Sequence, residues 1–114
     1  MKVMRLTLEV TVWLDRTDVN GLERVLLAER QRVFQQVFLR VAAELEREAL
    51  AQGGRCGCGG AGQRNGTKPR VLETLLGRIE LARVRLRCER CGAERYPLDE
   101  VLGLTPRAKH TLGV

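Results

Sequence analysis

The 114-residue chain has few aromatic side chains and no long apolar run. Only 4% of its residues are aromatic, so a core has to be built mainly from leucine and valine, and so small a fold often needs something besides burial. No apolar run approaches the roughly 20 residues that span a bilayer, and the N-terminus lacks the continuous apolar stretch of a signal peptide. We therefore expect a cytoplasmic protein with reduced cysteines and no membrane partner.

Catalysis that depends on histidine or on clustered carboxylates is also disfavoured. His110 is the only histidine, and no plausible carboxylate cluster accompanies it. General acid–base and hydrolytic metal chemistry need such groups close together. The length leaves no room for a large enzyme with a substrate domain of its own. We expect the chain not to be an enzyme.

The positive charge is confined to the C-terminal half. Residues 1–52 carry eight basic and eight acidic side chains, whereas residues 53–114 carry twelve basic and six acidic ones, so the whole formal net charge of +6 lies there. Seventeen of the twenty basic residues are arginine, whose planar guanidinium forms bidentate contacts with phosphates. This distribution favours a polyanion as the partner.

The N-terminal half predicts a β-strand followed by one long helix. In residues 3–14 every even position is apolar while positions 5, 7, 9 and 11 are polar, which is the two-residue period of a strand. From about Gly21 to Gln52 apolar residues recur every three or four positions, with no internal proline or glycine to break a helix. The centre of this stripe is Val33, Phe34, Val37, Phe38, Val41 and Leu45. A stripe this long needs a cover, so we expect a homodimer through the helix.

Two close pairs of cysteines lie in the basic half, on either side of a predicted hairpin. They are Cys56, Cys58, Cys88 and Cys91. Each pair is followed by glycine, residues 71–76 and 78–87 between them have the pattern of two strands, and zinc prefers four ligands in a tetrahedron. The pattern predicts a zinc ribbon with one structural Zn²⁺, although a single residue separates the first pair where two are usual. A redox dithiol at the second pair and a remnant without metal are the other interpretations.

The expected fold is α+β: an N-terminal β-strand and a long α-helix followed by a small zinc-ribbon β-hairpin with four cysteine ligands. Residues 1–52 form the strand and the helix, residues 53–104 the ribbon with its basic surface, and residues 105–114 a loose tail. In the second strand of the hairpin the apolar residues change parity near Ala82 and Arg83. This change predicts either a β-bulge at that point or partial cover on both faces.

Basic residues around the glycine-rich loop and along the second strand are candidates for contact with phosphates. They are Arg55, Arg64, Lys68, Arg70, Arg83, Arg85, Arg87 and Arg90. Arg83, Arg85 and Arg87 share one parity, so they are expected to present a row of guanidiniums on one face. Tyr96 is the only aromatic residue of the basic half, which disfavours stacking on single strands. Duplex DNA is therefore the expected partner.

From the first cysteine pair onward the chain resembles a known group of proteins. The matching elements are, in order, Cys58-Gly-Gly, Thr74-Leu-Leu-Gly77-Arg-Ile79-Glu-Leu81-Ala-Arg83, Cys88-x-x-Cys91-Gly and Tyr96-Pro97-Leu98-Asp99-Glu100-x-Leu102-Gly103-Leu104. Over residues 56–104 the chain is similar to the N-terminal region of bacterial insertion-sequence transposases of the Kra and Lre lineages. It departs from them at Arg85 and Leu86, where the family tends to carry aromatics, and in the narrower spacing of the first cysteine pair.

The resemblance implies the DNA-recognition end of a transposase without the catalytic domain, whose carboxylates hold Mg²⁺ for strand transfer. Asp99 and Glu100 belong to the ribbon, and no catalytic role is transferred to them. The expected function is a non-enzymatic module that binds duplex DNA at transposon ends, alone or beside a separately encoded catalytic chain. The alternatives are an adaptor that dimerises through the helix and has a purely structural ribbon, and an inactive remnant of a truncated transposase.

Overall fold

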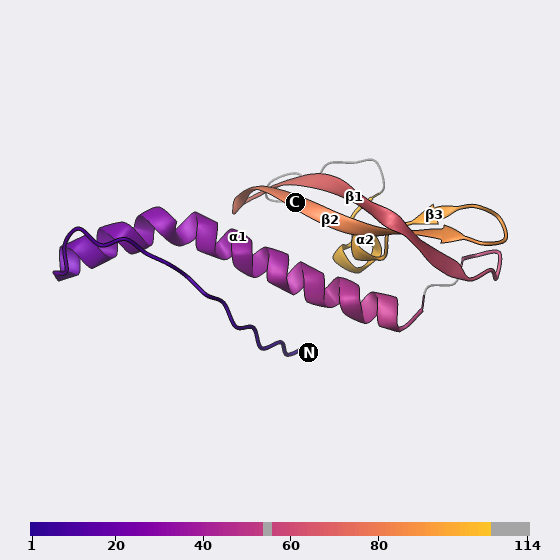
Figure 1. The fold of residues 1–114 in the computed structure, drawn as a ribbon, viewed down its shortest axis with the longest axis horizontal. Coiled ribbons are helices and arrows are strands. Elements are labelled where there is room, and N and C mark those ends of the chain that lie inside the picture. The colour runs from indigo at the N-terminus through magenta and orange to yellow at the C-terminus, as the bar shows by residue number, and fades with distance from the viewer. Residues whose placement is uncertain (54–55, 106–114) are drawn as a thin grey trace.

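In the computed structural model, which describes residues 1–53 and 56–105, one long helix lies beside an antiparallel sheet (Figure 1). The elements are, in chain order, α1 (Val19–Ala51), β1 (Gly62–Thr74), β2 (Gly77–Cys88), β3 (Glu94–Arg95) and α2 (Pro97–Leu102). The sheet has the order β1-β2-β3, and β1 and β2 form a long hairpin. The predicted long helix and hairpin are therefore confirmed. Of the predicted tail, all but Thr105 lies outside the described residues.

Helix α1 begins at a polar cap and continues for 33 residues. The carboxylate of Asp18 accepts a hydrogen bond from the backbone amide of Gly21 at 3.1 Å, which satisfies one of the amides that the first turn leaves without a partner. Gly53 follows the helix in the left-handed conformation, with a φ of 70°. Neither α1 nor any other helix in the described parts of the chain is long and apolar enough to cross a membrane.

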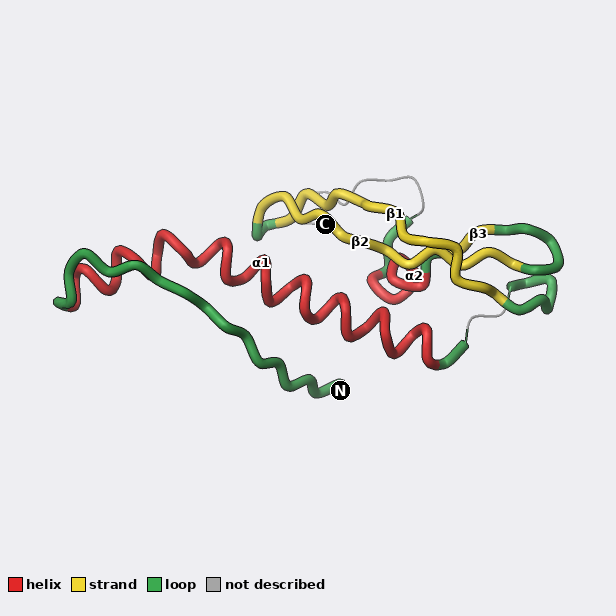
Figure 2. Tube along the Cα trace, viewed as in Figure 1, coloured by secondary structure: helices red, strands yellow, loops and turns green. Residues whose placement is uncertain are grey.

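The prediction of an N-terminal strand is wrong. Residues 1–18 contain neither helix nor strand, and residues 3–14, which we call the N-terminal arm, run along α1 (Figure 2). The alternation in the arm reflects one covered face, because Met4, Leu6 and Leu8 are half-buried while their odd-numbered neighbours are exposed. A helix covers that face here, and no strand among the described residues pairs with the arm. Alternation alone cannot distinguish these two kinds of cover.

Contacts at both ends of the arm define its direction. Lys2 forms an ion pair with Glu48, near the end of α1. Arg32, sixteen residues earlier in the helix, donates from Nη2 to the carbonyl of Thr11 at 3.4 Å. The arm is therefore antiparallel to the helix, and it occupies a different face of α1 from the hairpin.

The core lies where the middle of α1 meets the hairpin and α2. Its buried members are Ala42, Leu72, Ile79, Leu81 and Leu98, with Phe38, Leu76, Leu102 and Leu104 packed against them. Phe38 of the predicted dimer stripe therefore belongs to the intramolecular core. Phe34, one turn earlier, is 54% exposed, so the N-terminal part of the stripe is left open in the single chain.

Two glutamines of α1 hold the tip of the hairpin. The carbonyl of Leu76 accepts hydrogen bonds from Gln35 at 2.7 Å and from Gln31 at 3.1 Å. Gly77, the next residue, has a φ of 96°, and a Cβ there would lie 2.2 Å from the amide nitrogen of Gln31. The positive φ favours glycine at this position, and a side chain there would also displace the two glutamine amides.

At the parity change in β2, Val84 and Arg85 are both half-buried, and a bulge lies opposite them in the partner strand. The register shifts between Arg64 and Thr67 of β1, opposite Leu86 and Val84 of β2. The backbone amide of Val84 donates to Oε2 of Glu46 at 2.9 Å, so α1 satisfies a ladder group beside the bulge. The predicted irregularity exists, but it lies in β1 rather than in the second strand.

Candidate metal centre

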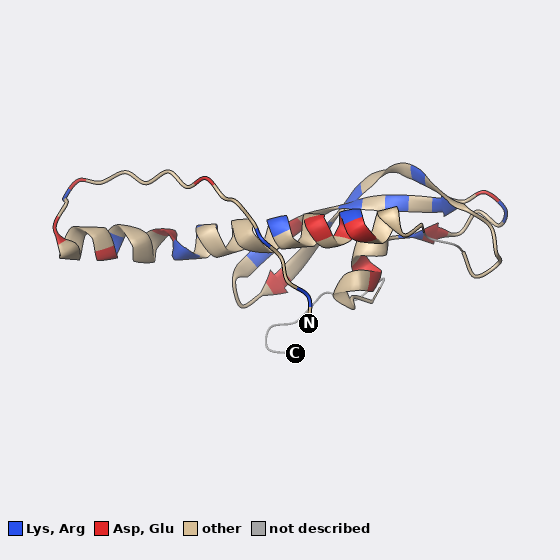
Figure 3. Ribbon diagram, turned by 90° about the horizontal axis from the view of Figure 1, so that it is seen from below, with Lys and Arg blue, Asp and Glu red and all other residues tan. Residues whose placement is uncertain are grey.

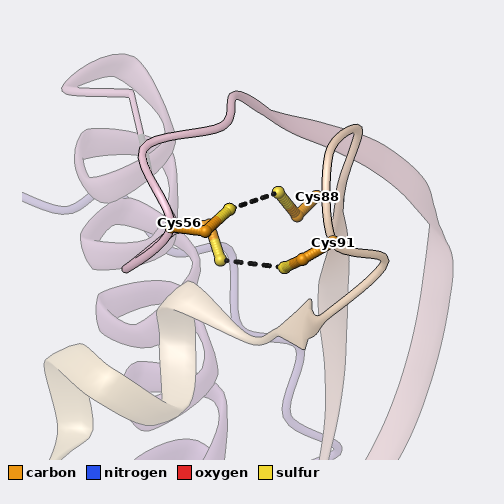
Figure 4. Close-up of side chains that lie close together, drawn as sticks. Cys56, Cys88 and Cys91 are labelled. Carbon is orange, nitrogen blue, oxygen red and sulfur yellow. Dashed lines mark hydrogen bonds between the residues drawn. The ribbon is translucent and has the colours of Figure 1, made fainter.

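All four cysteines meet at one end of the hairpin, and Figure 4 labels three of them, Cys56, Cys88 and Cys91. Cys56 and Cys58 lie in the loop before β1, Cys88 ends β2, and Cys91 lies in the turn before β3. Their sulfurs all lie within 4.8 Å of one another, and two pairs, Cys56 with Cys91 and Cys58 with Cys88, are 3.4 Å apart. A tetrahedron with metal–sulfur distances of about 2.3 Å has edges of about 3.8 Å. The cluster therefore has suitable dimensions to hold one metal ion such as Zn²⁺.

Tight turns at glycines position the sulfurs. The amide of Gly59 donates to the carbonyl of Cys56 at 2.8 Å, and the amide of Gly92 donates to the carbonyl of Cys88 at 3.1 Å. Both glycines have positive φ, 88° and 77° respectively, which side chains rarely allow. The glycine that follows each cysteine pair in the sequence is thus a requirement of the turn that closes the pair.

Gly60 keeps the space between the two pairs free of a side chain. A Cβ at this position would lie 2.7 Å from the sulfur of Cys88 and 3.4 Å from the sulfur of Cys58. Gly60 is itself buried, so a larger residue has no open direction into which to move. The loop is shaped so that sulfur atoms from both pairs can come together, as a shared metal ion requires.

Backbone amides influence the charge of the thiols. Hydrogen bonds from the amides of Cys91 and Arg90 lower the pKa of Cys88 to about 6. For Cys58, the amide of Gly60 acts to lower the pKa, but hydrogen bonds with the neighbouring thiols outweigh it and raise the pKa to about 12. Without a cation, the cluster thus favours a thiolate at Cys88 beside a neutral thiol at Cys58. A bound metal ion supplies the positive charge that lets all four lose their protons.

A divalent ion with four thiolates carries a net charge of −2, and arginines lie close enough to offset it. Arg90 donates from Nη1 to the carbonyl of Cys58 at 3.3 Å. The hydrogen bonds that Arg95 donates to Glu100 raise the pKa of Arg95, and the charge of Cys56 contributes in the same direction. The basic residues at this end of the hairpin therefore have a role beside the cluster in addition to any role toward a partner.

Arg83, Arg85 and Arg87 do not form the expected row of guanidiniums on one exposed face, because Arg83 is buried and Arg85 is half-buried. Arg83 is only 6% exposed, and its Nη1 lies 2.6 Å from Oδ2 of Asp99, which is 4% exposed. Its guanidinium carbon also lies 4.0 Å from the centroid of the Tyr96 ring, a cation–π contact. Arg70 reaches the same Asp99 oxygen at 3.0 Å. Both arginines are therefore committed to an internal carboxylate rather than to phosphates.

The other candidates differ in how accessible they are. Arg85 is half-buried and donates to the carbonyl of Asn65 at 2.9 Å. The exposed members of the predicted set are Arg64, Lys68, Arg87 and Arg90. Arg55 lies outside the described residues. Figure 3 shows that lysine and arginine follow both long strands of the hairpin.

An open depression lies between the two strands beside the cysteines. It is lined by Gln63, Arg64, Asn65, Arg87, Cys88 and Glu89. Arg64 lines this depression from β1, just before the bulge, and Arg87 lines it from β2. Two exposed arginines thus border the same depression next to the metal centre.

Two functional contacts of the fold were missed in the sequence. Asp99 is the buried partner of two arginines, and Glu46 is the acceptor for a bulge amide. A signal for the first was present, since Arg83 shares the parity of Ile79 and Leu81 and so falls on the buried face of β2. No comparable local signal marks Glu46, because its partner is 38 residues away.

Comparison with known proteins gives no relative: no family model matches the chain, and no curated protein or solved structure is significantly similar to it. The cysteine cluster, the exposed basic side chains and the motifs described above are therefore the observations from which function has to be argued.

Proposed function

We propose that this protein is a non-enzymatic, zinc-stabilised module that binds duplex DNA and corresponds to the DNA-recognition end of an insertion-sequence transposase. One observation carries the proposal: exposed basic side chains lie at the same end of the hairpin as a cluster of four cysteines. A metal ion there would hold the hairpin end rigid, and rigid presentation lowers the entropy lost when arginines contact a phosphate backbone.

Zinc would have a structural role. Four thiolates leave no open coordination position, so the ion would not activate water or a substrate. The bulge separates the hydrophobic core from the cysteine end of the hairpin. Between the bulge and the cysteine end, the buried residues of β2 are Leu86 and Cys88. The cysteine end therefore has little apolar burial of its own, which is the situation in which small domains depend on a metal.

The DNA contacts would come from the four exposed residues Arg64, Lys68, Arg87 and Arg90. With about −0.9 per neutralised phosphate, four contacts predict a slope of about −3.6 for log K against log[salt]. Such contacts position a protein on the backbone without reading its sequence. Selectivity for particular ends would then need further contacts to base edges.

The structure offers a reason for the motifs that support the transposase resemblance. Within Tyr96-Pro97-Leu98-Asp99-Glu100, Leu98 is part of the core and Asp99 binds Arg83, which belongs to another matching element. Glu100 is occupied as well, because its carboxylate lies 2.7 Å from Arg95. Both carboxylates of the string thus have arginine partners within the ribbon, which supports a structural role for them and a chain that does not itself cleave DNA.

The test is a salt titration of duplex DNA binding with the zinc-loaded protein. The double variant Arg64→Ala/Arg87→Ala should reduce the magnitude of the slope by about 1.8 units, from two contacts at about 0.9 each. Arg78→Ala, an exposed arginine near the opposite end of the hairpin, is the matched control and should leave the slope unchanged. Zinc content should be equal in all three proteins.

Two results would contradict the proposal. The first is an equal affinity of the double variant and the parent for DNA, which would place the binding surface elsewhere. The second is Mg²⁺-dependent nicking of DNA by the chain alone, which would mean that the protein is an enzyme.

A further inference from the structure

The N-terminal arm has the sequence of a strand but uses almost none of its backbone hydrogen-bonding groups. Among the described residues, no amide of residues 3–14 donates a hydrogen bond, and the carbonyl of Thr11 is the one acceptor in use. Valine, threonine and leucine, with one tryptophan, make up most of the arm, and β-branched and aromatic residues favour strands. Such an unpaired edge is a template for another strand.

We propose that the arms of two copies of this chain pair with each other as an antiparallel ribbon centred on Thr7, which makes the protein a symmetric dimer. In this arrangement the numbers of facing residues add up to 14. The pairing is isologous, so every contact occurs twice except the central one, in which Thr7 faces its own counterpart.

Charge complementarity supports this register. On the outer face, Arg5 of each copy lies opposite Glu9 of the other, so one dimer contains two ion pairs and the central Thr7 pair. In the single chain, neither Arg5 nor Glu9 forms an ion pair with another described residue, so both charges are available to a second copy.

Other registers are less favourable. A shift by one residue places polar side chains on the apolar face. A shift by two residues in either direction sets Arg5 opposite Thr7 or Thr11, and both ion pairs are lost. A parallel, in-register pair sets Arg5 against Arg5 and Glu9 against Glu9, which repel each other.

The apolar face is also self-complementary. The same register sets Leu6 opposite Leu8 and Met4 opposite Val10. In the single chain α1 covers only the first part of this face, because Leu6 and Leu8 are half-buried whereas Val10 is 42% exposed. In the dimer, the covered part of one arm lies beside the uncovered part of the other. The second copy thereby extends the cover along both arms.

Charge reversal with rescue tests the pairing without any DNA, so its outcome is independent of the proposed function. Arg5→Glu alone, or Glu9→Arg alone, creates two like-charge contacts per dimer and should raise the dimer dissociation constant at least tenfold in sedimentation equilibrium. The combined variant Arg5→Glu/Glu9→Arg restores both pairs in reversed order and should recover the parent constant. A parent that stays monomeric at high micromolar concentration, or single variants that dimerise as well as the parent, would overturn the proposal.

Cross-linking tests the register itself. Thr7→Cys places two cysteines opposite each other and should give a disulfide-linked dimer on mild oxidation of the zinc-loaded chain. Thr11→Cys is the matched control, because its two copies are separated by eight residues along the ribbon, or about 27 Å at about 3.4 Å per residue. The control should cross-link no more than the parent, whose own cysteines give the background. Equal cross-linking of the two variants would contradict the register.

Discussion

Asp99 is the residue whose removal should damage the fold most, because it is the carboxylate for two arginines. Its Oδ2 lies 2.6 Å from Arg83 and 3.0 Å from Arg70, and the three side chains are between 6% and 9% exposed. Asp99→Ala leaves both guanidiniums in place without their counter-charge. Breaking a buried pair by removing one partner costs about 3–5 kcal/mol, because the remaining charge is uncompensated.

Arg83→Ala and the double variant Asp99→Ala/Arg83→Ala complete a double-mutant cycle. Arg83→Ala removes the shorter ion pair and the contact with Tyr96, yet Asp99 keeps Arg70. Removing Asp99 and Arg83 together should cost less than the sum of the two single losses, by about 1–3 kcal/mol, since the residues act as one unit. Glu100→Ala is the control: its pair with Arg95 is partly exposed, so the loss should stay below about 1 kcal/mol.

Urea unfolding of the zinc-loaded chain measures these free energies, with the circular dichroism of the helix as the signal. A loss below about 1 kcal/mol for Asp99→Ala would refute the reasoning, as would single losses that simply add. The first result would mean that the two guanidiniums do not depend on the carboxylate, and the second that Asp99 and Arg83 are not coupled.

Three further changes have defined outcomes. Gly60→Ala should lower zinc affinity at least tenfold in a competition assay with a chelator, because the added methyl group meets two sulfurs. Glu46→Ala should cost about 1–2 kcal/mol in urea unfolding, since it leaves the amide of Val84 without its acceptor. Arg95→Gln should raise the pKa of Glu100, which hydrogen bonds from Arg95 now hold below its usual value. The Arg95–Glu100 ion pair stabilises the fold at pH values above the pKa that Glu100 has in the unfolded chain. This stabilisation is lost as the pH falls through the lower pKa that Glu100 has in the folded protein. NMR titration of the Glu100 carboxyl measures the change in its pKa.

The features that could be predicted are those with a local physical cause. The helix was expected over residues 21–52 and spans Val19–Ala51, because an unbroken periodic stripe leaves the chain little alternative. The four cysteines were grouped from their spacing, because glycine turns after each pair are a local device. The hairpin turn was placed at Leu76 and Gly77, and the structure has it at Leu75 and Leu76, directly before Gly77.

The features that could not be predicted depend on partners far away in the sequence. The alternation in the arm indicates a covered face but not whether a strand or a helix covers it. β1 begins at Gly62, within the glycine-rich segment expected to be a loop, because pairing with Cys88 outweighs a poor local preference for strand. Arg83 was taken for a surface residue because of its charge and the parity it shares with Arg85 and Arg87, and its partner Asp99 lies 16 residues further along the chain.

Metal analysis of the full chain, purified under reducing conditions without a chelator, tests the central claim most directly. The geometry of Cys56, Cys58, Cys88 and Cys91 predicts one Zn²⁺ per chain and four thiols that a thiol reagent titrates only after the metal is removed. Removal should also unfold the cysteine end of the hairpin. A stoichiometry near zero, with all four thiols freely titratable in the folded protein, would contradict the account.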